Sequence, residues 1–322
     1  MSPIRYSGGT LDRAAKLRED DDWVSAAFVS DGAVAVLVHN DRNLVTGLAG
    51  REETPRAALV PLALVREKLP ASGGIWAFLG LAGEIPVFAI DVSADGVAPI
   101  PELDDLGEFV DLRRAGPLLP AEEAAVLAYA RAVLTWHRRH RHCSVCGSPT
   151  ESHKAGHARR CTDTSCAAES FPRTDPVVIM LVTRSGGPGA PGVCLLGRHA
   201  RLPRGAYSLL AGFVEPGESL EDAVAREVME ETSVRVCDTR YQGSQPWPFP
   251  YSMMIGFRAT AETEDIVLDD ELEDARWFTA QQVAEFGEWA DESATFRKPR
   301  KDSIARYLLD QWVSEESRGQ SS

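Results

Sequence analysis

The chain has 322 residues, of which 44% are hydrophobic and 25% are charged, and its formal net charge at pH 7 is −14. This length and composition are typical of a globular protein with room for two or more domains. The acidic balance argues against a general nucleic-acid or membrane-surface binder, because such proteins normally carry a basic surface. No apolar run approaches the roughly 20 residues of a membrane-spanning helix, so we expect a cytoplasmic protein that binds no membrane.

Residues 1–115 predict a first domain built mainly of short strands. The runs AVAVLVH (33–39) and IPVFAIDV (85–92) are strand-like, and AALVPLALVREKL (57–69) is a candidate helix. We find no group of catalytic residue types in this half of the sequence. We therefore interpret it as a scaffold or dimerisation domain.

A long helix is predicted across residues 116–142. Acidic residues stand in its first turn and basic residues in its last, which the helix dipole favours. Arg138, Arg139 and Arg141 lie where they could contact a phosphate. We interpret them as a solvated helix end.

Four of the six cysteines have the spacing of a metal site. Cys143 and Cys146 form a CxxC pair, and Cys161 and Cys166 follow it. Four thiolates can close a tetrahedral Zn²⁺ site that leaves no ligand position open, so residues 143–168 predict a zinc ribbon with one structural Zn²⁺. The wider second pair leaves open whether Cys166 or a histidine completes the site. The nearby histidines are His142, His153 and His157.

From residue 169 to about residue 316, strand and helix patterns alternate, which predicts a mixed α/β domain, and residues 317–322 predict a disordered tail. Its strongest signal is GFVEPGESLEDAVAREVMEETSV, residues 212–234, in which Ser219 begins a helix. On a helical wheel, Glu227 and Glu231 lie within about 40° of the apolar Leu220.

Carboxylates on the apolar side of a helix need a cation, because burying a lone carboxylate costs several kcal/mol. We expect Arg226 to satisfy one carboxylate, that of Glu218, and not those of Glu227, Glu230 and Glu231 as well. Oxygen ligands with incomplete protein coordination suit Mg²⁺ or Mn²⁺. The sequence therefore predicts a divalent-cation site on this helix.

The same segment resembles the Nudix box, G-x5-E-x7-R-E-U-x-E-E-x-G-U, in which U is a bulky aliphatic residue. The one departure is Ser233, which stands where the box has its last glycine. The resemblance implies a Nudix α/β/α sandwich with a mixed sheet. It also implies hydrolysis of a nucleoside diphosphate linked to another group.

Further motifs resemble those of the NADH pyrophosphatase family of Nudix hydrolases. They are the cysteine segment, SQPWPFP after the box, FPRTDP, EDARWF and SIAR. The resemblance covers the chain from about residue 116 to residue 310. The first domain resembles the family's degenerate Nudix-like N-terminal domain in position and length. A homodimer is implied by the family.

Carried over to this chain, the resemblance implies a set of metal ligands. Glu227, Glu231, Glu271 and the carbonyl of Ala211 would hold two or three Mg²⁺ or Mn²⁺ ions, and Glu230 would act as a ligand or as the base that orients water. The alternatives to Glu271 are Glu273 and Asp274.

The resemblance also implies substrate-binding residues. Phe213 and Phe171 would offer ring faces to the nicotinamide end, although the family usually has tyrosine at the position of Phe171. The other residues expected to line the dinucleotide site are Gln245, Pro246, Trp247, Pro248, Phe249, Pro250, Tyr251, Ser252 and Ala305. Three prolines fix the backbone of this run in advance, so its rings can form preset walls.

The implied reaction converts NAD(H) and water into NMN(H) and AMP. One alternative is the removal of NAD caps from RNA 5′ ends by the same chemistry, and another is a different Nudix substrate such as ADP-ribose. A third is a zinc-ribbon regulatory protein with an inactive Nudix fold. That alternative predicts the loss of a box glutamate, yet Glu227, Glu230 and Glu231 are all present.

Overall fold

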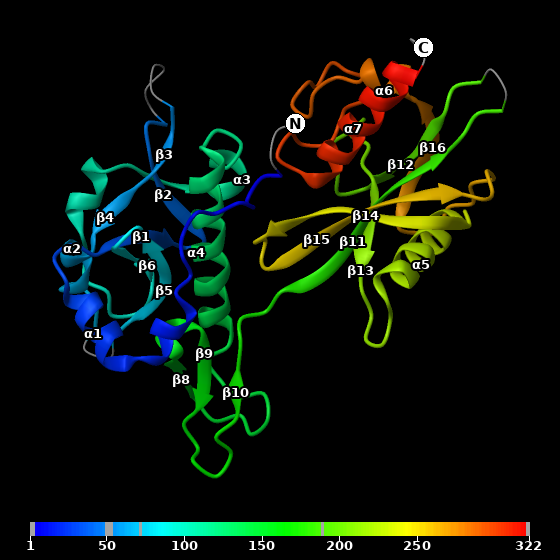
Figure 1. Ribbon diagram of the computed structural model, residues 1–322. Helices are drawn as coiled ribbons and strands as arrows, with labels where there is room; N and C mark the ends of the chain where they lie inside the picture. Colours follow the sequence, from blue (N-terminus) through cyan, green and yellow to red (C-terminus); the bar gives the residue numbers. More distant parts are fainter. Residues whose placement is uncertain (1–3, 49–53, 71–72, 188–189, 320–322) are drawn as a thin grey trace. The chain divides into compact units, whose positions relative to one another are not determined.

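The computed structural model describes residues 4–48, 54–70, 73–187 and 190–319, and the chain divides into two compact units (Figure 1). The first unit comprises Tyr6–Thr174 together with Trp247–Tyr251. The second comprises Asp175–Pro246 and Ser252–Ser322 with a few N-terminal residues. None of the helices in the described part of the chain is both long and apolar enough to cross a membrane.

The first unit contains a seven-stranded sheet in the order β3-β2-β1-β6-β5, with β4 on β1 and β7 on β2. Only the β1–β6 pair is parallel among the pairs described. The strands are β1 (Val34–His39), β2 (Arg42–Thr46), β3 (Arg56–Ala57), β4 (Leu59–Pro61), β5 (Ile75–Ala82), β6 (Ile85–Asp91) and β7 (Glu108–Asp111). The two strand-like runs of the sequence correspond to β1 and β6.

Helices cover both faces of this sheet. Val36 and Val38 of β1 join the apolar cluster of the long helix α4 (Ala121–Arg139), while Ala35 and Leu37 join the opposite cluster. Successive side chains of a strand point to opposite faces, which accounts for this alternation. The other helices of the unit are α1 (Asp21–Val29), α2 (Leu62–Arg66) and α3 (Leu112–Ala115), with short 3₁₀ turns at η1 (Ala15–Glu19), η2 (Pro101–Asp105) and η3 (Lys154–Gly156).

Two predictions for this half were wrong in detail. The candidate helix at 57–69 is shorter, because Leu59–Pro61 form strand β4 against β1 and the helix α2 begins only after Pro61. The end of α4 is not simply solvated. Arg138 forms ion pairs with Asp41 and with the fully buried Asp91, so this arginine belongs to the interior of the unit.

A small three-stranded antiparallel sheet completes the first unit. It has the order β10-β9-β8 and comprises β8 (Thr150–His153), β9 (Ala158–Cys161) and β10 (Glu169–Ser170). His137 of α4 connects to this ribbon, since its Nε2 lies 2.8 Å from the carbonyl oxygen of Gly156 and its Nδ1 lies 2.9 Å from Arg159. Burial lowers the pKa of His137 to about 4, so the ring is neutral in this contact.

The second unit is an α/β/α sandwich around a six-stranded mixed sheet. Its order is β14-β15-β11-β12-β16, with β13 on β11, and the β11–β15 pair is parallel. The strands are β11 (Asp175–Arg184), β12 (Val193–His199), β13 (Leu210–Phe213), β14 (Val236–Trp247), β15 (Ser252–Ala261) and β16 (Leu272–Thr279). This confirms the predicted fold class.

Separate apolar clusters form on the two faces of this sheet. Val178 and Met180 of β11 pack in the cluster of α5 (Leu220–Thr232), whereas Ile179 and Leu181 pack in the cluster of α7 (Ile304–Gly319). Helix α6 (Ala280–Ala284) lies on the α7 face (Figure 1). Because α7 continues to Gly319, residues 317–319 are helical and not part of a tail, and residues 320–322 lie outside the described residues.

Helix α5 begins and ends where its sequence predicts. Ser219 accepts a hydrogen bond from the backbone N–H of Asp222 at 3.1 Å and so caps the first turn. At the other end, Ser233 has φ 59°, in the left-handed region, and its N–H donates to the carbonyl of Met229 at 2.8 Å. A residue with a Cβ is strained in this conformation, which glycine adopts freely.

We therefore expect Ser233→Gly to raise the free energy of unfolding by about 1 kcal/mol, because it removes the left-handed strain of a residue with a Cβ. Urea denaturation measures the change. Ser233→Ala retains the Cβ and should give no such gain, and an equal gain from both variants would contradict the explanation.

Candidate active site

The carboxylate of Glu227 lies directly against strand β13. A Cβ atom added to Gly212 would overlap this carboxylate, so only glycine leaves the space that Glu227 occupies. Burial raises the pKa of Glu227, and the negative charges of Glu230 and Glu271 raise it further against the opposing effect of Arg226. The absence of a side chain at Gly212 therefore allows the carboxylate of Glu227 to lie against β13.

Arg226 binds more carboxylates than expected. Its guanidinium donates to Glu218 at 2.7 Å and to Glu227 and Glu230 at 2.9 Å each. It also donates to the carbonyl oxygen of Phe213 at 2.9 Å. The expectation of a single partner was wrong, because Arg226 stands between the loop before α5 and the next turn of the same helix.

Of Glu227, Glu230 and Glu231 on α5, Arg226 contacts only the first two among the described residues. Its residue is 4% exposed, and its Oε2 atom is buried with no hydrogen-bond partner among the described residues. Burial, together with the charges of Glu227 and Glu271, raises the pKa of Glu231 to about 8. A buried carboxylate oxygen without a donor is what a bound cation would satisfy.

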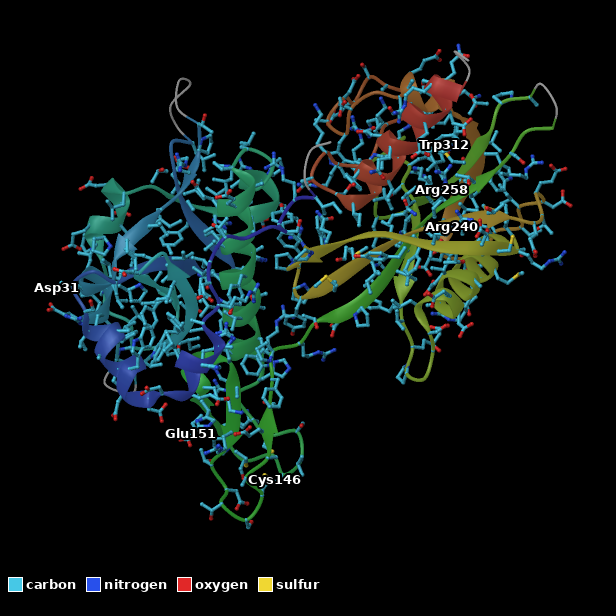
Figure 2. All side chains as sticks on the ribbon, in the orientation of Figure 1. Asp31, Cys146, Glu151, Arg240, Arg258 and Trp312 are labelled. Carbon is cyan, nitrogen blue, oxygen red and sulfur yellow. The ribbon has the colours of Figure 1, made fainter. Side chains whose placement is uncertain are left out.

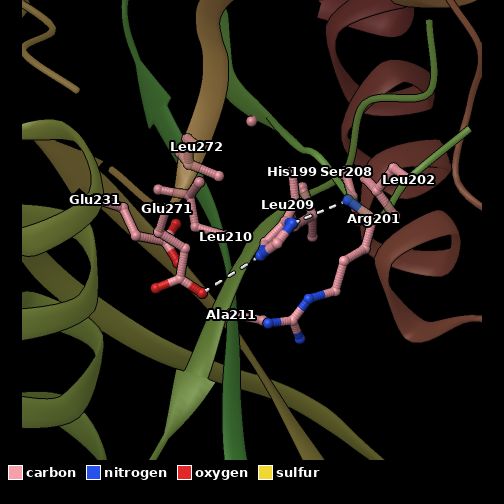
Figure 3. Close-up of a pocket in the computed structure, with 11 residues that line it drawn as sticks. His199, Arg201, Leu202, Ser208, Leu209, Leu210, Ala211, Glu231, Glu271 and Leu272 are labelled. Carbon is pink, nitrogen blue, oxygen red and sulfur yellow. Dashed lines mark hydrogen bonds and ion pairs between the residues drawn. The ribbon is translucent and has the colours of Figure 1, made fainter. Parts of the chain in front are cut away.

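Glu231 shares a cavity of about 250 Å³ with Glu271 and with Ala211 of β13 (Figure 3). The two alternatives to Glu271 are engaged elsewhere. Glu273 forms an ion pair with Arg198, and Asp274 accepts a hydrogen bond from Tyr207. The geometry thus gathers Glu231 and Glu271 at one place.

These residues fit a hard divalent cation. The donor set consists of carboxylate oxygens, which Mg²⁺ and Mn²⁺ prefer over nitrogen or sulfur. Among the described residues, Glu231 keeps a buried oxygen without a hydrogen-bond partner, and the carboxylate of Glu227 packs against Gly212 from the same helix. Burial and the neighbouring carboxylates raise the pKa values of Glu227 and Glu231, and a cation here would offset both effects.

The four cysteines of the ribbon also converge. Their Sγ atoms all lie within 4.8 Å of one another, with Cys143 and Cys166 at 3.8 Å and Cys146 and Cys161 at 3.4 Å. Cys146 lies in a loop beside the small sheet β8–β10 (Figure 2). A tetrahedral zinc site with Zn–S bonds of about 2.3 Å places its sulfurs about 3.8 Å apart. Within the described residues the group comprises Cys166 and no histidine, which fits a four-thiolate structural site.

The two aromatic residues expected at the nicotinamide end are both exposed. Phe213 follows Gly212 on β13 and is 60% exposed. Phe171 belongs to the first unit, is 57% exposed, and has the Lys154 ammonium 5.6 Å from its ring centroid. Each ring offers a free face on which a flat base can stack.

Gln245 and Ala305 are buried in the second unit. The side-chain amide of Gln245 donates to the carbonyl of Asp302 at 2.6 Å, and its oxygen accepts from the N–H of Ile304 at 2.8 Å. Ala305 follows directly and packs in the α7 cluster. Gln245 thereby ties β14 to the start of α7.

The proline-rich run at 247–251 belongs to the first unit. Trp247 packs edge-on against Tyr6 and Phe249, with ring centroids 5.9 and 5.0 Å apart. Arg131 donates to the carbonyl of Pro248 at 2.9 Å. Tyr251, the last residue of the run, is buried. The flanking residues Pro246 and Ser252 belong to the second unit. The run is therefore packed against protein along most of its length.

Three family models match this chain in succession. Residues 32–136 match an NADH pyrophosphatase-like rudimentary NUDIX domain, residues 138–171 match the NADH pyrophosphatase zinc ribbon domain, and residues 173–299 match the NUDIX domain. A human protein named NAD-capped RNA hydrolase NUDT12 is 36% identical, over 96% of this chain and 73% of that protein. The chain belongs to the NADH pyrophosphatase family of Nudix hydrolases.

Bacterial relatives extend the likeness. NAD-capped RNA hydrolase NudC of Mycobacterium bovis is 37% identical to this Nudix hydrolase, over 94% of this chain and 92% of that protein. NudC of Pseudomonas syringae is 44% identical over 60% of this chain and 62% of that protein. The likeness to the mycobacterial protein thus includes all three domains.

Several residues that line the cavity of this Nudix hydrolase were not predicted from its sequence. They are Gly197, His199, Arg201, Leu202, Ser208, Leu209, Leu210 and Leu272. The available signal was the basic stretch GRHARLPRG, residues 197–205, directly before the box in an otherwise acidic chain. Basic residues beside a cluster of carboxylates indicate a charged site.

The raised pKa of Glu231 predicts how the stability of the metal-free enzyme depends on pH. The folded protein holds this proton up to about pH 8, whereas the unfolded chain releases it near the ordinary glutamate value of 4.5. Folding therefore takes up a proton between these values, and the free energy of unfolding falls as the pH rises through that range.

We expect Glu231→Gln to flatten this decline in buffers without added divalent ions, as measured by urea denaturation from pH 4.5 to 8. Glu221→Gln, an exposed change in the first turn of the same helix, should leave the slope unaltered. An equal slope in the wild type and Glu231→Gln would show that Glu231 is ionised in the folded protein.

Proposed function

We propose that this Nudix hydrolase cleaves the pyrophosphate bond of NADH and NAD⁺, and that it releases NMN(H) and AMP. The observation that carries the proposal is the gathering of Glu227 and Glu271 near Glu231, whose buried Oε2 atom has no hydrogen-bond partner among the described residues. In a chain with the NADH pyrophosphatase zinc ribbon, these carboxylates suit a negatively charged dinucleotide held through cations.

The carboxylates of Glu227, Glu231 and Glu271, with the carbonyl of Ala211, would hold two or three Mg²⁺ or Mn²⁺ ions. Bound there, such ions neutralise the pyrophosphate and lower the pKa of water, so the catalysis is mainly electrostatic. Glu230 is suited to orient the attacking water, since its side chain is 56% exposed and Arg226 fixes one of its oxygens at 2.9 Å. Arg226 also donates to Glu227 at 2.9 Å and so holds both carboxylates in place.

Specificity for the dinucleotide would come from flat rings and a preset backbone. Phe213 and Phe171 would stack on the nicotinamide, and the run from Gln245 to Ser252 would line the site with Ala305. Base stacking on an aromatic ring contributes about 1–3 kcal/mol, which charge alone cannot supply when all substrates carry a pyrophosphate. We further propose a cytoplasmic homodimer.

Removal of NAD caps from RNA is the second function that we propose for the same site. It involves the same bond, and the human and mycobacterial relatives both bear the name NAD-capped RNA hydrolase. The net charge of −14 disfavours tight general RNA binding, so the cap would have to provide most of the recognition. An inactive regulatory role is not supported, because the box keeps its three glutamates.

The function is tested by incubating the protein and Mg²⁺ or Mn²⁺ with NADH, NAD⁺, ADP-ribose and NAD-capped RNA, followed by chromatography of the products. We expect NMN(H) and AMP from the dinucleotides. Glu227→Gln and Glu230→Gln should each lower kcat by about 100-fold or more, since they remove preorganised charge from the site.

Glu221→Gln, on the exposed side of the same helix, provides the matched control and should retain wild-type activity. Absence of AMP from every dinucleotide would exclude the proposed function. Unchanged activity in Glu227→Gln would exclude the proposed mechanism.

Trp247→Ala tests the role of the proline-rich run. If Trp247 forms a wall of the dinucleotide site, the ratio of kcat/KM for NADH to that for ADP-ribose should fall about tenfold, in line with the loss of one stacking contact. Tyr6→Leu is the control, because it loosens the same packing without removing Trp247. A lower melting temperature with an unaltered substrate ratio would identify Trp247 as a structural brace only.

A further inference from the structure

The pairing of β12 with β16 contains a bulge beside the cavity. Arg198 lies opposite Asp274 in the strand register, but the next residue, His199, lies opposite Leu272. No residue of β12 therefore lies directly opposite Glu273. Such bulges redirect the side chains that flank them. Here the bulge separates the ion pair of Arg198 with Glu273 from the contact of His199 with Glu271.

The hydrogen bonds of His199 determine which ring nitrogen carries the proton. The backbone N–H of Arg201 donates to Nδ1 of His199 at 3.1 Å, so Nδ1 is an acceptor. The ring proton therefore resides on Nε2, which lies 3.7 Å from Oε1 of Glu271 (Figure 3). An N–H group of His199 thus faces the carboxylate of Glu271.

Glu271 is the carboxylate of the site that most needs to be held. Its side chain is 55% exposed, compared with 12% for Glu227, and it stands directly before β16. Burial raises the pKa values of Glu227 and Glu231, and the charge of Glu271 raises both further. Repulsion among like charges would favour rotation of Glu271 into solvent, away from the other two.

We infer that His199 is a positioning residue that directs the carboxylate of Glu271 towards the cavity shared with Glu231. The Nε2–H group attracts one oxygen of Glu271 and so keeps its carboxylate facing the cavity. In that position Glu271 and Glu231 could bind the same cation. The inference rests on the proposed function in one respect, namely that Glu271 is a cation ligand. Groups that orient a metal ligand typically change metal affinity by about 10–100-fold when they are removed.

Two substitutions of His199 separate this role from a purely structural one. In His199→Gln the amide nitrogen can take the position of Nε2 and present an N–H group to Glu271. In His199→Asn the amide oxygen can take the position of Nδ1 and accept from Arg201, but the side chain is too short to reach Glu271. The first variant keeps the contact with the ligand, and the second keeps the contact with the turn.

The direct measurement is Mn²⁺ binding, followed by electron paramagnetic resonance of the free ion, with no substrate present. We expect His199→Asn to weaken Mn²⁺ binding about tenfold and His199→Gln to remain within about threefold of the wild type. The reverse order would show that His199 only holds the turn at Arg201, and would overturn the inference.

Arg198→Gln is the matched control, because it removes the neighbouring ion pair with Glu273 across the same bulge and should leave Mn²⁺ affinity unchanged. Glu271→Gln should weaken binding at least as much as His199→Asn, and the double variant should be no weaker than Glu271→Gln alone. If Glu271→Gln weakens binding while His199→Asn does not, the inference is wrong.

Failure of the proposed function gives a different pattern of results. If the predicted Mn²⁺ affinities are found but no dinucleotide is hydrolysed, the proposed function is excluded and the role of His199 stands. If Glu271→Gln binds Mn²⁺ like the wild type, Glu271 is no ligand and the inference about His199 falls with it.

Discussion

Repulsion among the carboxylates beside helix α5 is the constraint on which the site of this protein depends. Arg226 relieves part of it by contacting Glu218, Glu227 and Glu230, but it leaves Glu231 with a buried oxygen that has no donor among the described residues. Burial, together with the charges of the neighbouring carboxylates, raises the pKa of Glu231 to about 8. A fold that keeps such an arrangement sacrifices stability in order to keep a place for a cation.

The sheet of the second unit maintains this arrangement. Apolar side chains of β11 alternate between two clusters, so α5 is anchored on one face and α7 on the other. Gly212 of β13 leaves room for the carboxylate of Glu227, and the bulge between β12 and β16 separates Glu271 from Glu273. The backbone at Gly212 and at the β12–β16 bulge therefore decides which carboxylates meet.

The run around Trp247 has a structural role, whatever part it plays in the proposed dinucleotide site. Its prolines restrict the backbone, and its rings pack on Tyr6 within the first unit. Gln245, at the start of the run, uses its amide to bind the backbone at residues 302 and 304. Residues that we propose as walls of the dinucleotide site thus also connect parts of the protein that are distant in sequence.

The sequence by itself determined the features that depend on local periodicity or spacing. The helix of Glu227 and Glu231, its cap at Ser219 and the cysteine group follow from patterns within about 25 residues. The helix proposed at 57–69 failed because β1, distant in sequence, recruits Leu59–Pro61 as a strand. Only the tertiary structure separated Glu271 from Glu273 and Asp274, and brought His199 to it, because strand register is set by pairing between segments some 70 residues apart.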